Sequence, residues 1–522
     1  MPPVALAALL CLAPQAPEAA PTPLARTADA SAPAWDRPIL ADPKAAPTQA
    51  RAPRMFRDHG VGPTIDTTER PRSAFALDVD TASFGLARAA LSRGELPRPA
   101  EVRVEEFIEV FAAPPSQTKR GSAPVGIEID AVASSQRRGY QVVRITAYAH
   151  QRAPRPVDVV VAVDVSSAMA TPPDLDDARE AVQALGGALT RDDRLALVEL
   201  SSPPEVLAPL ATPPSIADLE TATGTLGPAE APAMSEASLE AAYDLLRSRD
   251  PDRDRVLVVI GPGSLPKPAG ADPRHAVWSL ARAANRRGIT TMPVGIGRGF
   301  FDDVLLGGLS NAGRGAYVFA HEPSDTGRQL AQTVHAPVVA HDPVLEVEFD
   351  PAAVTRYRLL GFESRREPAP TANGQPHAAA LRAGGAVTAL YEVKLREGAP
   401  IAWGQVRLRY TNPETGKASD VVRSLDGLEA GVALADAAAP TQLSVLAAAV
   451  AEKLRASYWA RRITWSQLRE RYDALPEDVR AQPDVARLGD LLDDAASLED
   501  DGTRRVPGRT GRRPFARQPV VR

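Results

Sequence analysis

A run of apolar, mostly β-branched residues occupies positions 157–165 and is interrupted only by Asp158 and Asp164. An apolar run without alternation is typical of a strand that is buried on both faces, as in the middle of a parallel sheet. Asp164 and Ser166 stand at the carboxyl end of this predicted strand. Parallel sheets bind ligands at that end of their strands, so these two side chains are the first candidates for function.

Strand-like and helix-like patterns alternate around this run, from residue 156 to residue 336. Apolar runs predict further strands at 194–200, 255–260, 289–296 and 315–319. Apolar residues at helical spacing predict helices at 176–189, 235–248, 274–287 and 325–334. Regular alternation of strand and helix predicts an α/β domain with a doubly wound, mostly parallel, Rossmann-like sheet.

The segments on both sides of this domain alternate apolar and polar residues with a period of two. Residues 125–132 and 141–149 read as a hairpin, and four later strands are predicted at 344–349, 355–363, 386–393 and 404–410. Such alternation is typical of half-buried antiparallel strands. We therefore expect one antiparallel β-sandwich with the α/β domain inserted into it. Amphipathic patterns predict C-terminal helices at 443–456 and 465–475 that pack on the sandwich.

These patterns divide the chain into eight parts. They are a signal segment at 1–20, a disordered linker at 21–72, an N-terminal segment at 73–115, the hairpin of the sandwich at 120–155, the α/β domain at 156–336, the rest of the sandwich at 337–430, a helical C-terminal part at 431–500 and a basic disordered tail at 501–522. The apolar run at 4–13 resembles the core of a secretory signal without a basic start. We therefore expect an extracytoplasmic location, in the periplasm or cell envelope.

Composition and charge exclude further classes of function. A net charge of −5 does not favour nucleic-acid binding. The single cysteine, Cys11, excludes an intrachain disulfide. No later stretch of about 20 apolar residues occurs, so no membrane span is expected. The basic tail either contacts an anionic partner or is simply solvated.

Asp164 and Ser166 carry hard oxygen atoms, which Mg²⁺, Ca²⁺ or Mn²⁺ accept as ligands. This stretch resembles the first strand of von Willebrand factor type A (VWA) domains, whose metal-ion-dependent adhesion site begins Asp-x-Ser-x-Ser. Here the third ligand position is Ala168. The resemblance implies a threonine and a second aspartate on other loops, but Ala233 and Gly261 fall at those positions.

We therefore expect no cofactor, because only the remnant formed by Asp164 and Ser166 is left. The alternative is weak binding of Mg²⁺ or Ca²⁺ with a substitute hydroxyl from Ser201, Ser202 or Ser235. Asp164 could otherwise cap the following turn or accept hydrogen bonds from backbone amides.

Two further regions carry a second resemblance. Residues 73–84 contain Asp78-Val79-Asp80-Thr81-Ala82-Ser83, and residues 102–106 read Val-Arg-Val-Glu-Glu. Together with motifs at 357–363 and 387–392 they resemble bacterial VWA proteins of the YfbK type, over roughly residues 73–480. Asp78, Asp80 and Ser83 could form a second oxygen cluster, or the carboxylates could cap backbone amides in a turn and the next helix.

Nothing in the sequence favours catalysis. None of the seven histidines stands in a metal or triad motif: His59, which falls in the predicted linker, His150, His275, His321, His335, His341 and His377. No phosphate-binding loop or dinucleotide fingerprint is present. We expect a non-catalytic interaction or adhesion-type protein that binds an unknown protein partner through the loops at 201–204 and 261–266, on the top face of the VWA-like domain. The alternative is metal-dependent binding of a partner carboxylate.

Overall fold

The computed structural model describes residues 54–115, 123–228, 234–248, 250–266, 272–365, 379–398, 402–500 and 503–504. The predicted signal segment and the first part of the predicted linker lie outside the described residues. So does the predicted basic tail, apart from the backbone of β20 (Thr503–Arg504), which pairs with β19 (Glu499–Asp500). None of the described helices is both long and apolar enough to span a membrane.

The predicted α/β domain is present, with β6 (Val157–Asp164) in the interior of a six-stranded sheet. The strand order is β12-β10-β9-β6-β7-β8, and only β8 runs antiparallel to its neighbour. Every residue of β6 is buried, as its continuous apolar run predicted. The other strands are β7 (Arg194–Leu200), β8 (Glu205–Ala211), β9 (Asp254–Gly261), β10 (Ile289–Gly295) and β12 (Val318–Phe319).

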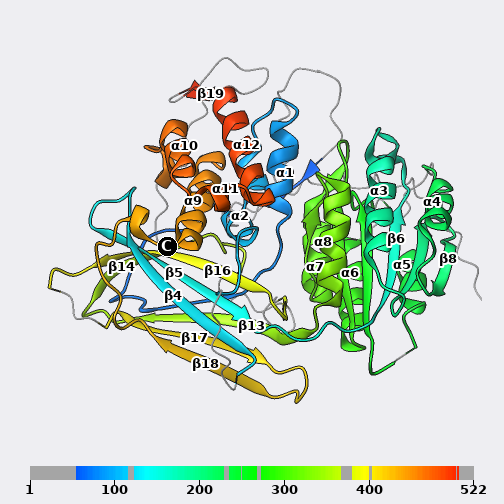
Figure 1. The fold of residues 1–522 in the computed structure, drawn as a ribbon, viewed down its shortest axis with the longest axis horizontal. Coiled ribbons are helices and arrows are strands. Elements are labelled where there is room, and N and C mark those ends of the chain that lie inside the picture. Colours follow the sequence, from blue (N-terminus) through cyan, green and yellow to red (C-terminus); the bar gives the residue numbers. More distant parts are fainter. Residues whose placement is uncertain are drawn as a thin grey trace, which may run out of the picture.

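Six helices cover this sheet (Figure 1). They are α3 (Asp174–Ala188), α4 (Ile216–Gly224), α5 (Glu236–Asp244), α6 (Arg274–Arg286), α7 (Asp303–Gly313) and α8 (Pro323–His335). Helix α3 packs against α4 and α8, and α6 packs against α5 and α7. The sequence did not predict β8, α4 or α7. Glycines lower the helix propensity of α7, but Gly308 lets it pack closely, since a Cβ there would lie 2.2 Å from the Trp278 ring.

The predicted sandwich is also present, and the VWA-like domain is inserted into it. One sheet holds β3 (Arg72–Ala76), β13 (Val338–Phe349), β15 (Ala380–Arg382), β17 (Gly404–Thr411) and β18 (Ala418–Ser424). The other holds β2 (Ile65–Asp66), β14 (Val354–Leu360), β16 (Ala386–Leu395), β5 (Tyr140–Ala149) and β4 (Val125–Ala133). Strand β5, before the insertion, pairs with β16, after it, over nine residue positions. This pairing closes the sandwich around the insertion.

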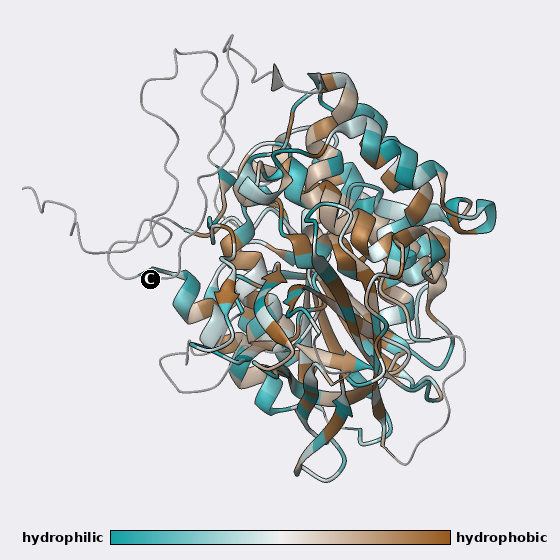
Figure 2. Cartoon of the chain, turned by 90° about the vertical axis from the view of Figure 1, so that its left-hand side faces the viewer, coloured by the Kyte–Doolittle hydropathy of each residue, from teal (hydrophilic) through white to brown (hydrophobic). Residues whose placement is uncertain are grey.

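A helical layer lies on the sandwich, beside the VWA-like domain (Figure 1). It combines helices from the two ends of the chain: α1 (Ala82–Leu91), α2 (Val104–Glu109), α9 (Ala439–Leu454), α10 (Trp465–Asp473), α11 (Glu477–Arg480) and α12 (Pro483–Leu498). Their shared core includes Phe84, Phe107, Leu446 and Leu488. Figure 2 shows apolar strands inside the molecule and hydrophilic turns on the outer helices.

The prediction of a disordered linker extending to residue 72 is wrong from Arg54 onward. Strand β1 (Arg54–Met55) pairs in parallel with β11 (Phe301–Asp302), and β2 pairs with β14. Phe56 is buried in the core of the VWA-like domain. The strands of this segment are two residues long, too short for any periodicity, and they are ordered by packing on distant parts of the chain.

Candidate functional site

Asp164 lies at the carboxyl end of β6 and is fully buried. Its Oδ1 accepts a hydrogen bond from the Ser166 amide at 2.9 Å, and its Oδ2 accepts one from the Ser264 amide at 3.2 Å. Burial raises the pKa of Asp164 to about 6, although the amide hydrogen bonds lower it in part. Both oxygens are therefore engaged by the backbone, one of them by a loop 100 residues away.

Ser166 follows Asp164 and is also fully buried. Its Oγ has no hydrogen-bond partner among the described residues. A buried hydroxyl without a partner is uncommon and costs stability. Ala168, in the third ligand position, supplies no oxygen. The two predicted site residues thus lie together at the end of β6, with the Ser166 hydroxyl close to the Asp164 carboxylate.

Gly261 ends β9 and faces Asp164. Its φ is +153°, and a Cβ on Gly261 would lie 2.4 Å from the Asp164 Cβ. No aspartate fits there without displacing Asp164, so a second carboxylate is excluded sterically as well as by sequence. The other replaced position, Ala233, lies outside the described residues.

Two of the three proposed substitute hydroxyls, those of Ser201 and Ser235, are engaged elsewhere, and the third, Ser202, is exposed. Ser201 Oγ donates to the Pro203 carbonyl at 2.7 Å. Ser235 caps the start of α5, where its side chain accepts from the Ser238 amide. Mg²⁺ requires nearly octahedral oxygen coordination. One carboxylate, whose two oxygens each accept an amide hydrogen bond, and the hydroxyls of Ser166 and Ser202 fall short of that set, so the described residues do not fit the metal ion that the family pattern implies.

Restoring the missing carboxylate should not restore a site. Gly261→Asp is expected to lower the free energy of unfolding by about 1–3 kcal/mol, because the new side chain meets Asp164 and the backbone conformation disfavours any Cβ. Urea denaturation with and without Mg²⁺ measures this. Gly224→Ala, at the end of α4 with nothing within 4 Å of the added Cβ, is the control and should change stability by less than about 1 kcal/mol. A stable Gly261→Asp protein that Mg²⁺ stabilises further would contradict the expectation.

The second oxygen cluster contains a different third member from the one expected. Carboxylate oxygens of Asp78, Asp80 and Glu106 lie within 4.8 Å of one another, and all three residues are buried. Ser83 instead ties the segment together, since its Oγ donates to the Glu101 carbonyl and accepts from the Arg103 amide.

Backbone amides and hydroxyls use part of this oxygen cluster, as the turn interpretation predicted. Asp78 Oδ1 accepts from the Asp80 amide at 3.1 Å. Asp80 Oδ1 accepts from the Tyr317 amide at 2.7 Å and from Ser310 Oγ at 2.8 Å, both in the VWA-like domain. The part of that interpretation concerning the next helix is wrong, because the residue before α1 makes no side-chain cap. Asp80 instead accepts hydrogen bonds from Ser310 and Tyr317 of the VWA-like domain, so it does not cap the local helix.

Two arginines neutralise the same cluster. Arg365 pairs with Asp78 and, at 3.5 Å, with Asp80. Arg103 pairs with Glu106 and, through both terminal nitrogens, with Asp303 at 2.9 and 3.1 Å. Burial raises the pKa of Asp80 well above its usual value, and the neighbouring Asp78 raises it further. Because guanidinium groups occupy the places where a cation would bind, this cluster is an ion-pair junction between the N-terminal segment, the VWA-like domain and the strand end after β14.

The sequence placed His59 in the disordered linker, and that placement is wrong. His59 lines a cavity of 240 Å³ beside this ion-pair junction, and burial, followed by Arg57 and Arg103, lowers its pKa to about 4. His335 Nε2 is hydrogen-bonded to Asp193 Oδ2 at 2.8 Å. Among the histidines that the structure describes, none is hydrogen-bonded to a serine, threonine or cysteine nucleophile, and His377 lies outside the described residues.

Three family models match successive parts of the chain. The model described as von Willebrand factor matches residues 51–144, the von Willebrand factor type A domain matches residues 159–264, and the C-terminal region of the uncharacterized protein YfbK matches residues 336–482. The uncharacterized protein YfbK of Escherichia coli (strain K12) is 25% identical over 502 residues, which cover 87% of this chain and 85% of that protein.

Two similar solved structures are more distant in sequence. A von Willebrand factor type A protein from Catenulispora acidiphila is 18% identical, with a TM-score of 0.41, and the match covers 72% of this chain and 90% of that chain. The ArnB paralog VWA2 from Sulfolobus acidocaldarius is 12% identical, with a TM-score of 0.34, and the match covers 72% of this chain and 98% of that chain.

Proposed function

This chain is a VWA-domain protein of the YfbK type, and we propose that it binds a protein partner through the top face of its VWA domain without a bridging metal ion. The top face is defined here as residues 165–173, 201–204 and 262–266, which follow β6, β7 and β9. The observation that carries the proposal is the state of Asp164. Its two oxygens accept amide hydrogen bonds, and Gly261 leaves no room for a second carboxylate.

The chemistry of the top face supports an uncharged contact. None of its 18 residues, nine at 165–173, four at 201–204 and five at 262–266, is charged. Its exposed residues are Ser167, Ala170, Thr171, Pro172, Pro173, Ser202, Pro203 and Pro266. Proline and small side chains lose little conformational entropy when they are covered. A partner would therefore present a neutral, largely apolar surface, and binding would depend little on salt.

The proposed role is non-catalytic, and the proposed location is the cell envelope. The first rests on the absence of a nucleophile with a hydrogen-bonded base among the described histidines. The second rests on the apolar run at residues 4–13, which lies outside the described residues.

Site-specific cross-linking in the producing cells tests the contact surface. A photoreactive residue at Ser202, on the top face, should give one discrete adduct, with the same yield in EDTA and in Mg²⁺. The matched control is Ser424, an exposed serine on the edge strand β18, where no such adduct should form. Equal labelling at both positions would refute the top face as the contact surface.

Thermal unfolding tests the proposed independence from metal. The melting temperature should be the same, within about 1 °C, in EDTA and in millimolar Mg²⁺, Ca²⁺ or Mn²⁺. A metal at 100 times its dissociation constant would instead add about 2.7 kcal/mol, a rise of several degrees for a domain of this size. A rise that disappears in Asp164→Ala would establish the alternative, a metal-dependent adhesion site with substitute ligands.

A further inference from the structure

A cleft of 420 Å³ lies where the VWA domain joins the sandwich, at the opposite end of the sheet from the top face. Its walls come from residues 151–154, just before β6, from the last turn of α8 and from the turn between β15 and β16. Both segments that connect the sandwich with the VWA domain, one before β6 and one after α8, therefore border this cleft. Clefts of this size, at the junction of domains, are where small ligands usually bind.

The ionisable side chains of this junction cleft are all basic. The lining residues are Gln151, Arg152, Pro154, Gln332, Thr333, His335, Ala336, Arg382, Ala383, Gly384 and Gly385. Two of them are arginines, one is a histidine and two carry amides, and none of these described lining residues is acidic. A wall of this composition attracts negative charge.

Arg382 is the cation of this wall that has no carboxylate of its own. Arg152 pairs with Glu414, and His335 pairs with Asp193. Arg382 donates to the Ala336 carbonyl at 2.7 Å and to Thr290 Oγ1 at 3.2 Å. No ion pair joins it to a carboxylate in the part of the chain that the structure describes.

Such a guanidinium has capacity left for a ligand. It carries five N–H donors in a fixed fork, and the two hydrogen bonds just named use two of them. Burial lowers the pKa of Arg382 to about 10, against a weak opposing effect of Asp254, so the side chain stays charged at neutral pH. A half-buried, charged guanidinium without a carboxylate partner binds an oxyanion more strongly than a fully exposed one does.

The turn beside Arg382 is shaped for a close approach. Gly384 has a φ of +72°, and a Cβ there would lie 2.2 Å from Gln151 Nε2. Only glycine permits this conformation together with this contact. The turn thus brings the Gln151 amide, a second neutral donor, to the wall that Arg382 lines.

We propose that this junction cleft binds the oxyanion, a phosphate or a carboxylate, of a small polar molecule, with Arg382 as the anchoring residue. The molecule would bridge the VWA domain and the sandwich, since α8 supplies one wall and the β15–β16 turn the other. This site does not rest on the function proposed for the top face.

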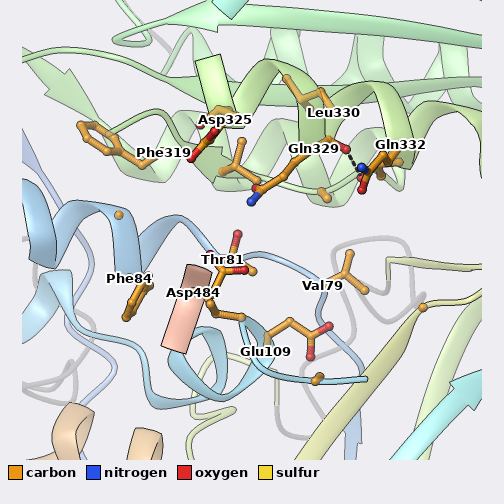
Figure 3. A pocket seen from close by; sticks show the side chains of 18 of the residues that line it. Val79, Thr81, Phe84, Glu109, Phe319, Asp325, Gln329, Leu330, Gln332 and Asp484 are labelled. Atoms are coloured by element: carbon orange, nitrogen blue, oxygen red, sulfur yellow. Dashed lines mark hydrogen bonds between the residues drawn. The ribbon is translucent and has the colours of Figure 1, made fainter. Parts of the chain in front are cut away.

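The space for the rest of the molecule is a neighbouring cleft of 530 Å³, which shares Gln332, Thr333, Arg382 and Gly385 with the junction cleft. Figure 3 shows this larger cleft, with Gln329 and Gln332 of α8 across from Thr81 and Glu109. Glu109 Oε2 is buried without a hydrogen-bond partner among the described residues. It offers a polar contact to a hydroxyl or amine on the body of the ligand.

Isothermal titration calorimetry on the full chain tests the proposal, with inorganic phosphate in one arm and acetate in the other. Chloride holds the ionic strength constant, so that only specific oxyanion binding gives heat. A dissociation constant of about 1 mM or tighter is expected in at least one arm. The arm that binds identifies phosphate or carboxylate as the ligand group, and heat in neither arm at about 10 mM would overturn the proposal.

Variants then locate the bound ion. Arg382→Gln should weaken binding at least tenfold, whereas Arg382→Lys, which keeps the charge, should retain part of it. Arg396→Gln is the control, because Arg396 is exposed and its side chain also donates to a backbone carbonyl, that of Pro351. Circular dichroism confirms that each variant is folded before titration. Unchanged binding in a folded Arg382→Gln protein would refute the assignment of the site.

Discussion

Arg358→Ala is expected to lower the free energy of unfolding by about 3–5 kcal/mol, because it removes the guanidinium that two buried carboxylates share. The Arg358 side chain is 1% exposed. Its Nε donates to Glu392 at 2.8 Å, and its NH1 lies 3.4 Å from Glu452. Glu392 belongs to the sandwich strand β16, and Glu452 belongs to α9. Arg358 therefore joins the helical layer to the sandwich.

The state of Glu452 explains why the loss is large. Burial alone would raise its pKa, but Arg455 and Arg358 together lower the pKa to about 2. Glu452 is thus ionised at neutral pH. Removing one arginine leaves its negative charge less compensated in a low-dielectric interior. Each carboxylate keeps one other arginine, since Arg137 lies 2.9 Å from Glu392 and Arg455 pairs with Glu452, but neither of these arginines bridges the two acids as Arg358 does.

Urea denaturation of the purified protein measures this effect. Arg356→Ala is the matched control. Arg356 lies on the same strand β14, but its side chain is 58% exposed and its Nε lies as far as 3.8 Å from Asp66 Oδ2. An exposed pair of this kind contributes at most about 1 kcal/mol. The expectation fails if the two variants lose similar amounts of stability.

Arg103→Ala is expected to cost a similar amount, about 3–5 kcal/mol, and to weaken the attachment of the VWA domain to the N-terminal segment. Arg103 lies just before α2 and bridges Glu106 of that helix to Asp303 at the start of α7. The Glu106 and Asp303 side chains are 3% and 9% exposed. Without the guanidinium, Glu106 would face the like charges of Asp78 and Asp303 without its own partner.

A double-mutant cycle between Arg103→Ala and Asp303→Ala isolates this contact across the domain boundary. The coupling energy should exceed about 1 kcal/mol, as for a buried, bidentate pair. Arg72→Ala with Glu348→Ala is the control cycle, because Arg72 is 64% exposed, and its coupling should be below about 1 kcal/mol. Equal coupling in the two cycles would show that Arg103 does not hold the domains together.

The sequence by itself was sufficient for most of the fold. The apolar run at 157–165 marked β6 as an interior strand, and period-two alternation at 141–149 and 386–393 marked the two strands that close the sandwich. The expectation that these two strands are half-buried is wrong, because α2 and α9 pack on their second face and bury nearly all of their residues. The patterns found the strands because buried positions take apolar side chains, but the period did not report the number of covered faces in β5 and β16. The glycine-containing helix α7 and the two-residue strand β1 were missed because neither shows a clear apolar period in the sequence.

The sequence also placed Asp164 and Ser166 side by side, because both follow one strand, but it did not determine their environment. That depends on the Ser264 amide, which lies 100 residues away, and on the space beside Gly261. The pairing of Arg103 with Asp303 and the unpaired state of Arg382 likewise depend on elements from three parts of the chain. Local periodicity encodes burial, whereas the partner of a buried charge is chosen by which distant strands and helices meet, and only the tertiary structure decides that.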